Sequence, residues 1–220
     1  MKINEIISSV DKDEILEIFN KYFKTNANAV IDIDDIGYVS CDHYVTSKNI
    51  CEFNILPIKF KFINGSFSCN ENRRLTSLIG FPDTLMYNTY CYGNGLKTLK
   101  GGPTSVNGIF NCSDNQLSNL EGCPYVTYDL NICNNPLESL NGLKSDIRRI
   151  FLTYTPTLPL LKCLTAKTIK FDPTGPLIKQ IQYVLNKYAG QGRKAALDCA
   201  ADLLSLGKKL GIDLTMNARW

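Results

Sequence analysis

The chain has 220 residues, of which 44% are hydrophobic and 20% charged, and its formal net charge is +3. These values are typical of a globular protein, and no apolar run approaches the roughly 18 residues that a membrane-spanning helix needs. The opening segment, MKINEIISSVDKDEI, has acidic residues where an export signal needs an apolar core. We therefore expect a cytoplasmic chain that makes no membrane contact.

Residues 1–28 predict an N-terminal helical cap. Their apolar residues recur at three- and four-residue steps, as a helix with one buried face requires, and Asp11 stands where it can cap a second helix before Ile15. Residues 29–42 then alternate between apolar and polar as strands do. The segment GYVSC at 37–41 resembles GSFSC at 65–69, which predicts an irregular first repeat with an insertion.

Four segments in the middle of the chain repeat one pattern: FSCNENRRLTSLIGFP (67–82), TYCYGNGLKTLKGGP (89–103), FNCSDNQLSNLEGCP (110–124) and LNICNNPLESLNGL (130–143). Two registers hold across all four copies, one of leucine at 78, 99, 120 and 140 and one of glycine at 80, 101, 122 and 142. A period of 20 to 22 residues with this spacing is the signature of a leucine-rich repeat solenoid. The predicted fold class is therefore α/β, with a parallel β-sheet built from successive repeats.

The pattern weakens after residue 143 and then changes to helix. A fifth copy keeps apolar residues at 150, 152 and 160, although Thr155 replaces the repeat asparagine, and residues 168–172 (TIKFD) predict a last strand. Beyond Pro176, two amphipathic helices are expected, the second with Leu197, Ala200, Leu203 and Leu204 directed inward. We therefore predict a solenoid over residues 29–172 and a two-helix C-terminal cap over residues 173–220.

The residue types within each repeat indicate structural roles. Cys69, Cys91 and Cys112 share one position, which Ile132 fills in the fourth copy, so we expect core thiols in a reducing compartment rather than disulfides or metal ligands. Asparagine follows three residues later in every copy, at 72, 94, 115 and 135. At a sharp turn, such side chains can satisfy backbone groups of their own and of the neighbouring coil. Since a coil this short leaves no room for a helix, the return segments should be extended or 3₁₀.

The pattern F-x-C-x-x-N-x-L-x-x-L-x-G-x-P, which residues 110–124 match throughout, resembles the short leucine-rich repeat proteins encoded by large tailed bacteriophages. The resemblance covers about residues 55–143, and it departs at Arg73, which is one residue too many, and in the fifth copy. It implies an interaction module in the cytoplasm of an infected bacterial cell, and it names no target.

The alignment predicts which side chains leave the solenoid. Because strand residues alternate between two faces, residues between the apolar positions should form one outward, concave sheet that is aromatic and uncharged at its centre. Tyrosine beside small polar residues is typical of protein interfaces. The predicted partner-binding residues are Tyr90, Tyr92, Asn111, Ser113, Asn131, Arg149 and Phe151.

Catalysis is not indicated. The single histidine, His43, lies in a polar turn, and a pair with Cys41 is disfavoured because Cys41 aligns with the buried repeat position. No sequence pattern suggests zinc or nucleotide chemistry, so we expect no metal and no cofactor.

The leading hypothesis is a non-enzymatic scaffold that captures a host or phage protein and thereby inhibits a host defence. Two alternatives stay open. One is a small-molecule sequestering protein. The other is nucleic-acid association through basic residues near the C-terminus, namely Arg193, Lys194, Lys208, Lys209 and Arg219.

Overall fold

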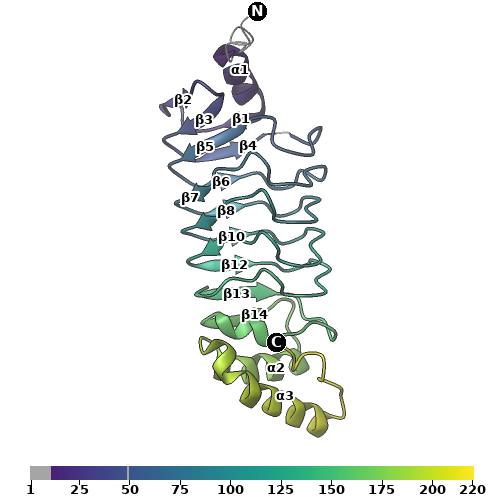
Figure 1. Ribbon diagram of the computed structural model, residues 1–220. Helices are drawn as coiled ribbons and strands as arrows, with labels where there is room; N and C mark the ends of the chain where they lie inside the picture. The colour runs from purple at the N-terminus through teal and green to yellow at the C-terminus, as the bar shows by residue number, and fades with distance from the viewer. Residues whose placement is uncertain (1–10, 49) are drawn as a thin grey trace, which may run out of the picture.

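The computed structural model describes residues 11–48 and 50–220 and shows an elongated α/β solenoid (Figure 1). It has about 6 turns with a spacing of about 21 residues, as the repeats predict. An eight-stranded main sheet runs along the stack, and apart from antiparallel β1 its strands are parallel. In spatial order the strands are β1 (Phe23–Lys24), β4 (Val45–Ser47), β6 (Phe67–Ser68), β8 (Thr89–Tyr90), β10 (Phe110–Asn111), β12 (Asp129–Asn131), β13 (Arg149–Leu152) and β14 (Thr168–Phe171).

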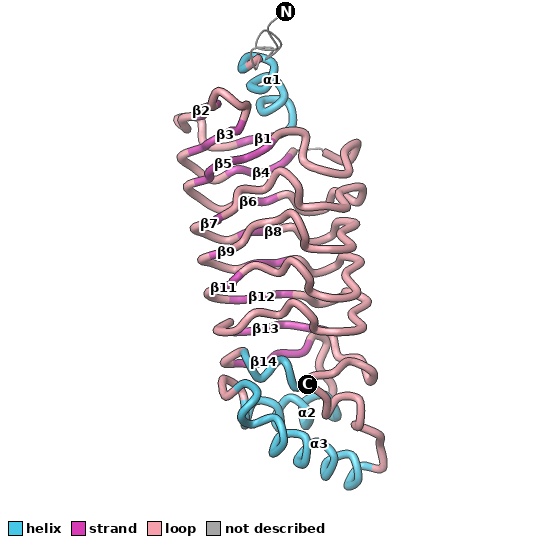
Figure 2. Tube along the Cα trace, viewed as in Figure 1, coloured by secondary structure: helices cyan, strands magenta, loops and turns pink. Residues whose placement is uncertain are grey.

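Two smaller sheets form a second side of the stack. The first contains β2 (Ile31–Ile33), β3 (Tyr38–Cys41) and β5 (Lys59–Ile63), and the second contains β7 (Thr84–Leu85), β9 (Ser105–Val106) and β11 (Tyr125–Val126). Strands β7, β9 and β11 follow one another down the left side of the molecule (Figure 2). The expectation of extended return segments is thus confirmed, and a 3₁₀ turn, η1 (Leu161–Thr165), follows β13.

The predicted equivalence of Cys41 with Cys69 is wrong. Cys41 lies on β3 and pairs with Ile63 of β5, whereas β6 pairs with β4 through Val45 and Phe67. Segment 37–41 therefore belongs to the second side of the stack and segment 65–69 to the main sheet. The two sequences look alike because both are short strands that enter the same core after a glycine.

The solenoid interior is a continuous column of apolar side chains. The repeat cysteines and their counterparts Ile132 and Leu152 are fully buried, which confirms their assignment to the core. Gly80, Gly101, Gly122 and Gly142 all have positive φ angles, between 80° and 99°. At Gly142 a Cβ atom would lie 2.0 Å from the Leu120 carbonyl oxygen, so only glycine fits between these coils.

The repeat asparagines form the predicted ladder. The Asn115 side-chain amide donates to the carbonyl oxygens of Cys91, Cys112 and Ser113 at 2.9 to 3.0 Å. Its Oδ1 atom accepts from the Leu96 backbone N–H of the preceding coil at 3.1 Å. Asn72, Asn94 and Asn135 likewise bond to their own coil and to the one before it. Each amide therefore joins two coils by hydrogen bonds to their buried backbone groups.

Helix α1 (Lys12–Tyr22) lies at one end of the stack, and the Asp11 side chain caps it by accepting from the N–H groups of Asp13 and Glu14. Residues 1–10 of the predicted cap lie outside the described residues. Helices α2 (Pro176–Tyr188) and α3 (Ala196–Leu210), with the 3₁₀ turn η2 (Gly192–Ala195) between them, lie at the other end.

Helix α2 closes the open edge of the main sheet through two side-chain amides. Asn186 accepts from the Ile169 N–H and donates to its carbonyl oxygen, both at 2.8 Å, and Gln182 accepts from the Phe171 N–H at 2.9 Å. These residues are four apart on one helix face, so they reach alternate residues of β14. An edge that could otherwise pair with another strand is thereby covered.

In α3 the predicted inward set is partly wrong. Leu203 is buried, but Leu197 is 85% exposed and Leu204 is 46% exposed, while Cys199 and Gly207 are buried instead. The helix has two apolar faces, and the buried one contains the smaller residues. At Gly207 a Cβ atom would lie 2.7 Å from the Ile212 carbonyl oxygen, so the segment that follows α3 requires a very small residue there.

Candidate interaction surface

Strand pairing brings the outward residues of the main sheet into one line. Within the sheet Ser68 lies beside Tyr90, Tyr90 beside Asn111, Asn111 beside Asn131, and Asn131 beside Phe151. Neighbouring strands lie about 4.8 Å apart. We call this line the register row; it comprises Thr46, Ser68, Tyr90, Asn111, Asn131, Phe151 and Lys170.

The register row contains four of the seven predicted partner-binding residues, namely Tyr90, Asn111, Asn131 and Phe151. Each is half-buried, with its outer side open to solvent. The row is uncharged from Thr46 to Phe151, and its first charged member is Lys170. Tyr92 is also half-buried and lies two residues after Tyr90, beyond the end of β8. The surface therefore offers aromatic and amide groups without fixed charge.

Ser113 does not belong to this surface, although the alternation of the strand predicts it. It is only 6% exposed, its N–H donates to Asn111 Oδ1 and its carbonyl oxygen accepts from Asn115. The chain turns into the solenoid here, with Asp114 at a positive φ of 54°. Strand periodicity ends at residue 111, so it cannot predict the direction of residue 113.

Arg149 is exposed and forms an ion pair with Asp129. Its guanidinium group donates to both carboxylate oxygens of Asp129 at 2.8 and 2.5 Å, and it lies 5.6 Å from the centre of the Phe151 ring. The hydrogen bonds from Arg149 to Asp129 raise the pKa of Arg149 above its ordinary value. The charge of Arg149 is therefore paired within the surface, beside the Phe151 ring. Asp129, which is 6% exposed, is the partner that sequence reasoning missed.

Cys41 and His43 each contact another side chain. The His43 ring lies 2.8 Å from Asp42, and the hydrogen bond from His43 lowers the pKa of that carboxyl. The Cys41 thiol is buried and lies 3.5 Å from the Thr25 hydroxyl. Burial also raises the pKa of the Cys199 thiol to about 12, which suppresses the reactive thiolate.

The described ranges 11–48 and 50–220 contain no group of three or more histidine, cysteine, aspartate or glutamate side chains placed to hold a metal ion. Over the same ranges no helix combines the length and apolarity needed to cross a membrane.

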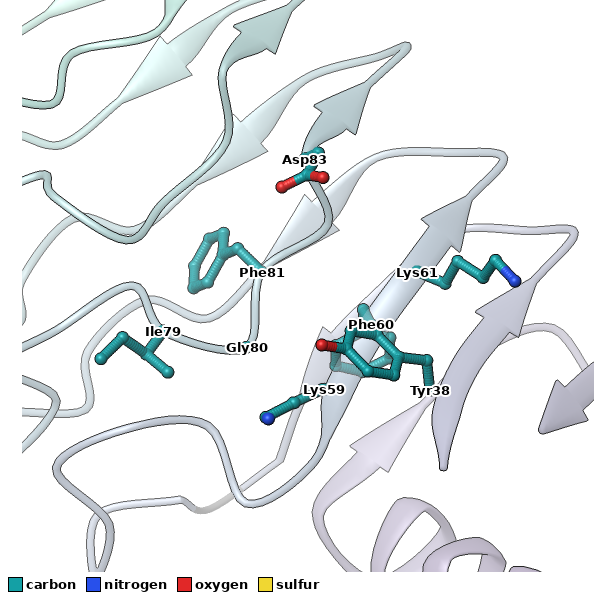
Figure 3. Close-up of a pocket in the computed structure, with 8 residues that line it drawn as sticks. All are labelled: Tyr38, Lys59, Phe60, Lys61, Ile79, Gly80, Phe81 and Asp83. Atoms are coloured by element: carbon teal, nitrogen blue, oxygen red, sulfur yellow. The ribbon is translucent and has the colours of Figure 1, made fainter. Parts of the chain in front are cut away.

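A pocket of 310 Å³ opens on the second side of the stack, where β5 and β7 fall into separate sheets (Figure 3). Its walls include Tyr38, Lys59 and Asp83, and the Lys59 ammonium lies 5.6 Å from the centre of the Tyr38 ring. Lys61 also lines it and bonds to Asp34 at 3.0 Å. The alternation of lysine with phenylalanine in β5 could have predicted the outward lysines, but no sequence signal predicted the break between the sheets.

The basic residues near the C-terminus do not form one continuous surface. Arg193 and Lys194 lie in η2 before α3, whereas Lys208 and Lys209 lie in its last turn, and all four are exposed. The two groups thus lie near opposite ends of a 15-residue helix, which is about 22 Å long. Exposed Leu197 and Leu204 lie between them, so nucleic-acid association stays a second hypothesis, without a continuous basic patch to carry it.

Comparison of the chain with protein-family models, with curated proteins and with solved structures finds no match in any of the three.

Proposed function

We propose that the chain is a non-enzymatic binding scaffold of the leucine-rich repeat type, and that it captures a protein partner through the register row and Tyr92. The observation that carries the proposal is the alignment of half-buried Tyr90, Asn111, Asn131 and Phe151 on neighbouring strands. Regular spacing on a rigid sheet lowers the entropic cost of ordering these side chains when a partner binds.

The chemistry of the row favours a protein partner. Tyrosine and phenylalanine give a large contact area with few rotatable bonds, and amide side chains donate and accept hydrogen bonds with equal ease. Since the row has no charge before Lys170, its partner should present a surface with little net charge. The Arg149–Asp129 pair fixes one border of this surface.

The resemblance of the repeats to phage-encoded proteins supports a bacterial cytoplasmic setting. In that setting, the partner would be a host or phage protein, and occupation of a host defence protein would block its action. Eight of the nine cysteines are buried free thiols, which suits a reducing compartment.

The test is an affinity pull-down from phage-infected and uninfected bacterial lysates. The baits are the unchanged chain, the double variant Tyr90→Ala/Tyr92→Ala and the matched control Tyr125→Ala, whose ring is 60% exposed on the other side of the stack. We expect the double variant to lose the specific partner and the control to keep it. Asn111→Arg, which places a charge in mid-row, should act like the double variant.

Nuclease treatment of the lysate separates the two hypotheses. A protein captured through the register row survives it, whereas material held through nucleic acid is lost. Equal recovery of partners by the unchanged chain and by the register-row variants would contradict the proposal, provided that thermal unfolding shows all baits to be folded.

A further inference from the structure

Helix α3 has an apolar face that packs against nothing within the described residues. Leu197, Ala201 and Leu204 follow one another at steps of four and three residues, on the side opposite the buried Cys199 and Leu203. A helix that only capped the stack would be polar on this side. In Figure 1, α3 is the outermost element at its end of the molecule.

A pocket of 400 Å³ lies beside this apolar face. Leu161, Leu197 and Trp220 contribute to its walls, and Arg193 stands at its edge. Lys194 precedes the helix, and Lys208 and Lys209 follow the apolar face in the last turn. The acidic residues of α3 lie to one side, and Asp202 is already bonded to Lys187 and Tyr188 at 2.8 and 2.7 Å. The α3 outer face is thus apolar at its centre and basic at both ends.

The opposite end of the molecule carries the complementary chemistry. Helix α1 buries Phe19 toward the stack, and its other face presents Asp13, Leu16, Glu17 and Asn20, all exposed and all within about one quarter of the helix circumference. Its lysines are directed elsewhere, since Lys12 pairs with Asp35 at 3.0 Å and the Lys21 ammonium lies 4.6 Å from the centre of the Tyr22 ring. The α1 outer face is therefore acidic with one apolar side chain.

We infer that the α3 outer face of one copy binds the α1 outer face of a second copy, so that the chain assembles head to tail. Leu16 would enter the pocket beside Leu197, while Asp13 and Glu17 would meet Arg193 and Lys194 at the nearer basic end of α3. The two faces lie at opposite ends of one stack, so the contact is heterologous and leaves a free face at each end of the assembly. An interface between helices of 11 and 15 residues is small, so the association should be weak and weakened further by salt.

The test is sedimentation velocity on the full chain from micromolar to near-millimolar concentration, at low and at high salt. We expect the weight-average mass to rise at least twofold with concentration at low salt and to rise far less at high salt. Leu197→Ser disables the α3 face, and Leu16→Ser/Glu17→Lys disables the α1 face. Both should stay monomeric, whereas the control Tyr183→Ser, at a site 77% exposed on α2, should assemble normally.

The decisive sample is an equimolar mixture of the two disabled variants. Each retains the face that the other lacks, so a head-to-tail contact predicts a mixed dimer that grows no further. Because these side chains point to solvent, circular dichroism and thermal unfolding should show unchanged folds. A monomeric unchanged chain, a symmetric dimer that Leu16→Ser/Glu17→Lys does not affect, or a mixture that stays monomeric would overturn the inference. None of these outcomes bears on partner capture through the register row.

Discussion

Single side chains hold neighbouring coils of this protein together. Asn115 uses one amide group to satisfy three carbonyl oxygens and one N–H from two coils. Where the fifth copy has Thr155 instead, Asn217 approaches from a segment about sixty residues later and donates to the carbonyl oxygens of Thr155 and Leu158 at 3.1 and 2.9 Å. The ladder thus continues through a residue that the repeat pattern could not reveal.

Replacement of one ladder asparagine should destabilise the protein strongly. Asn115→Ala leaves the buried Leu96 N–H without its partner and removes one of two donors from three carbonyl oxygens, so we expect the free energy of unfolding to fall by about 2 kcal/mol. Urea denaturation checks this value, with Asn119→Ala as the control, because Asn119 forms only local contacts at a half-buried site. Similar losses in the two variants would contradict the role of the ladder.

A substitution at Thr89 should raise the free energy of unfolding. It fills the inward position that Phe67 and Phe110 occupy on adjacent strands, and its buried hydroxyl has no hydrogen-bond partner. Thr89→Val keeps the shape and removes the unsatisfied group, so we expect a gain of roughly 1 kcal/mol in the free energy of unfolding. A shift of the thermal midpoint to a higher temperature would agree with this, and an unchanged or lower midpoint would not.

At the scale of elements, α2 stops the main sheet from extending. The amides of Gln182 and Asn186 occupy the backbone groups of β14 that a further strand would use. In Gln182→Ala/Asn186→Ala we expect an exposed strand edge and self-association through it. Light scattering during mild heating measures this, with Gln180→Ala as a matched control at an exposed position of the same helix. The double variant should aggregate at a lower temperature than the control.

Helix periodicity alone could not orient α3. Its sequence has apolar residues on two faces, and the buried face contains Cys199 and Gly207 rather than the larger Leu197. The chain that follows α3 leaves no room for a Cβ atom at Gly207, and this requirement comes from a neighbouring segment and not from helix periodicity. The same limit applies to Ser113, whose direction depends on a turn into the stack.

For the whole molecule, the column of buried thiols predicts how stability depends on pH. Burial raises the pKa of Cys123 and Cys163 to about 12 and that of Cys133 to about 11. An unfolded cysteine ionises at about pH 8.5, so above this pH the unfolded state loses protons that the native state keeps. We therefore expect full stability below about pH 8 and a progressive fall as pH rises toward the native pKa values.

Urea midpoints measured between about pH 7 and pH 10 test this dependence. Cys163→Ala should be less stable at every pH, but its decline with rising pH should be shallower because one ionising group has been removed. An equally steep decline in both proteins would assign the effect to other groups.

The sequence by itself determined the solenoid, its period, the buried cysteine position and the asparagine ladder. Each repeat has the same residue types at the same spacing, and coils of equal length stack in register. It also predicted Tyr90, Asn111, Asn131 and Phe151 as outward residues, since alternation along a strand is a local property. Tertiary structure decided what depends on contacts between distant segments: the place of Cys41 on the second side, the Asn217 substitute, the Arg149–Asp129 pair and the outward turn of Leu197. In each of these, the partner is supplied by another coil or by a cap, so its position follows from packing and not from the residue's own neighbours in the sequence.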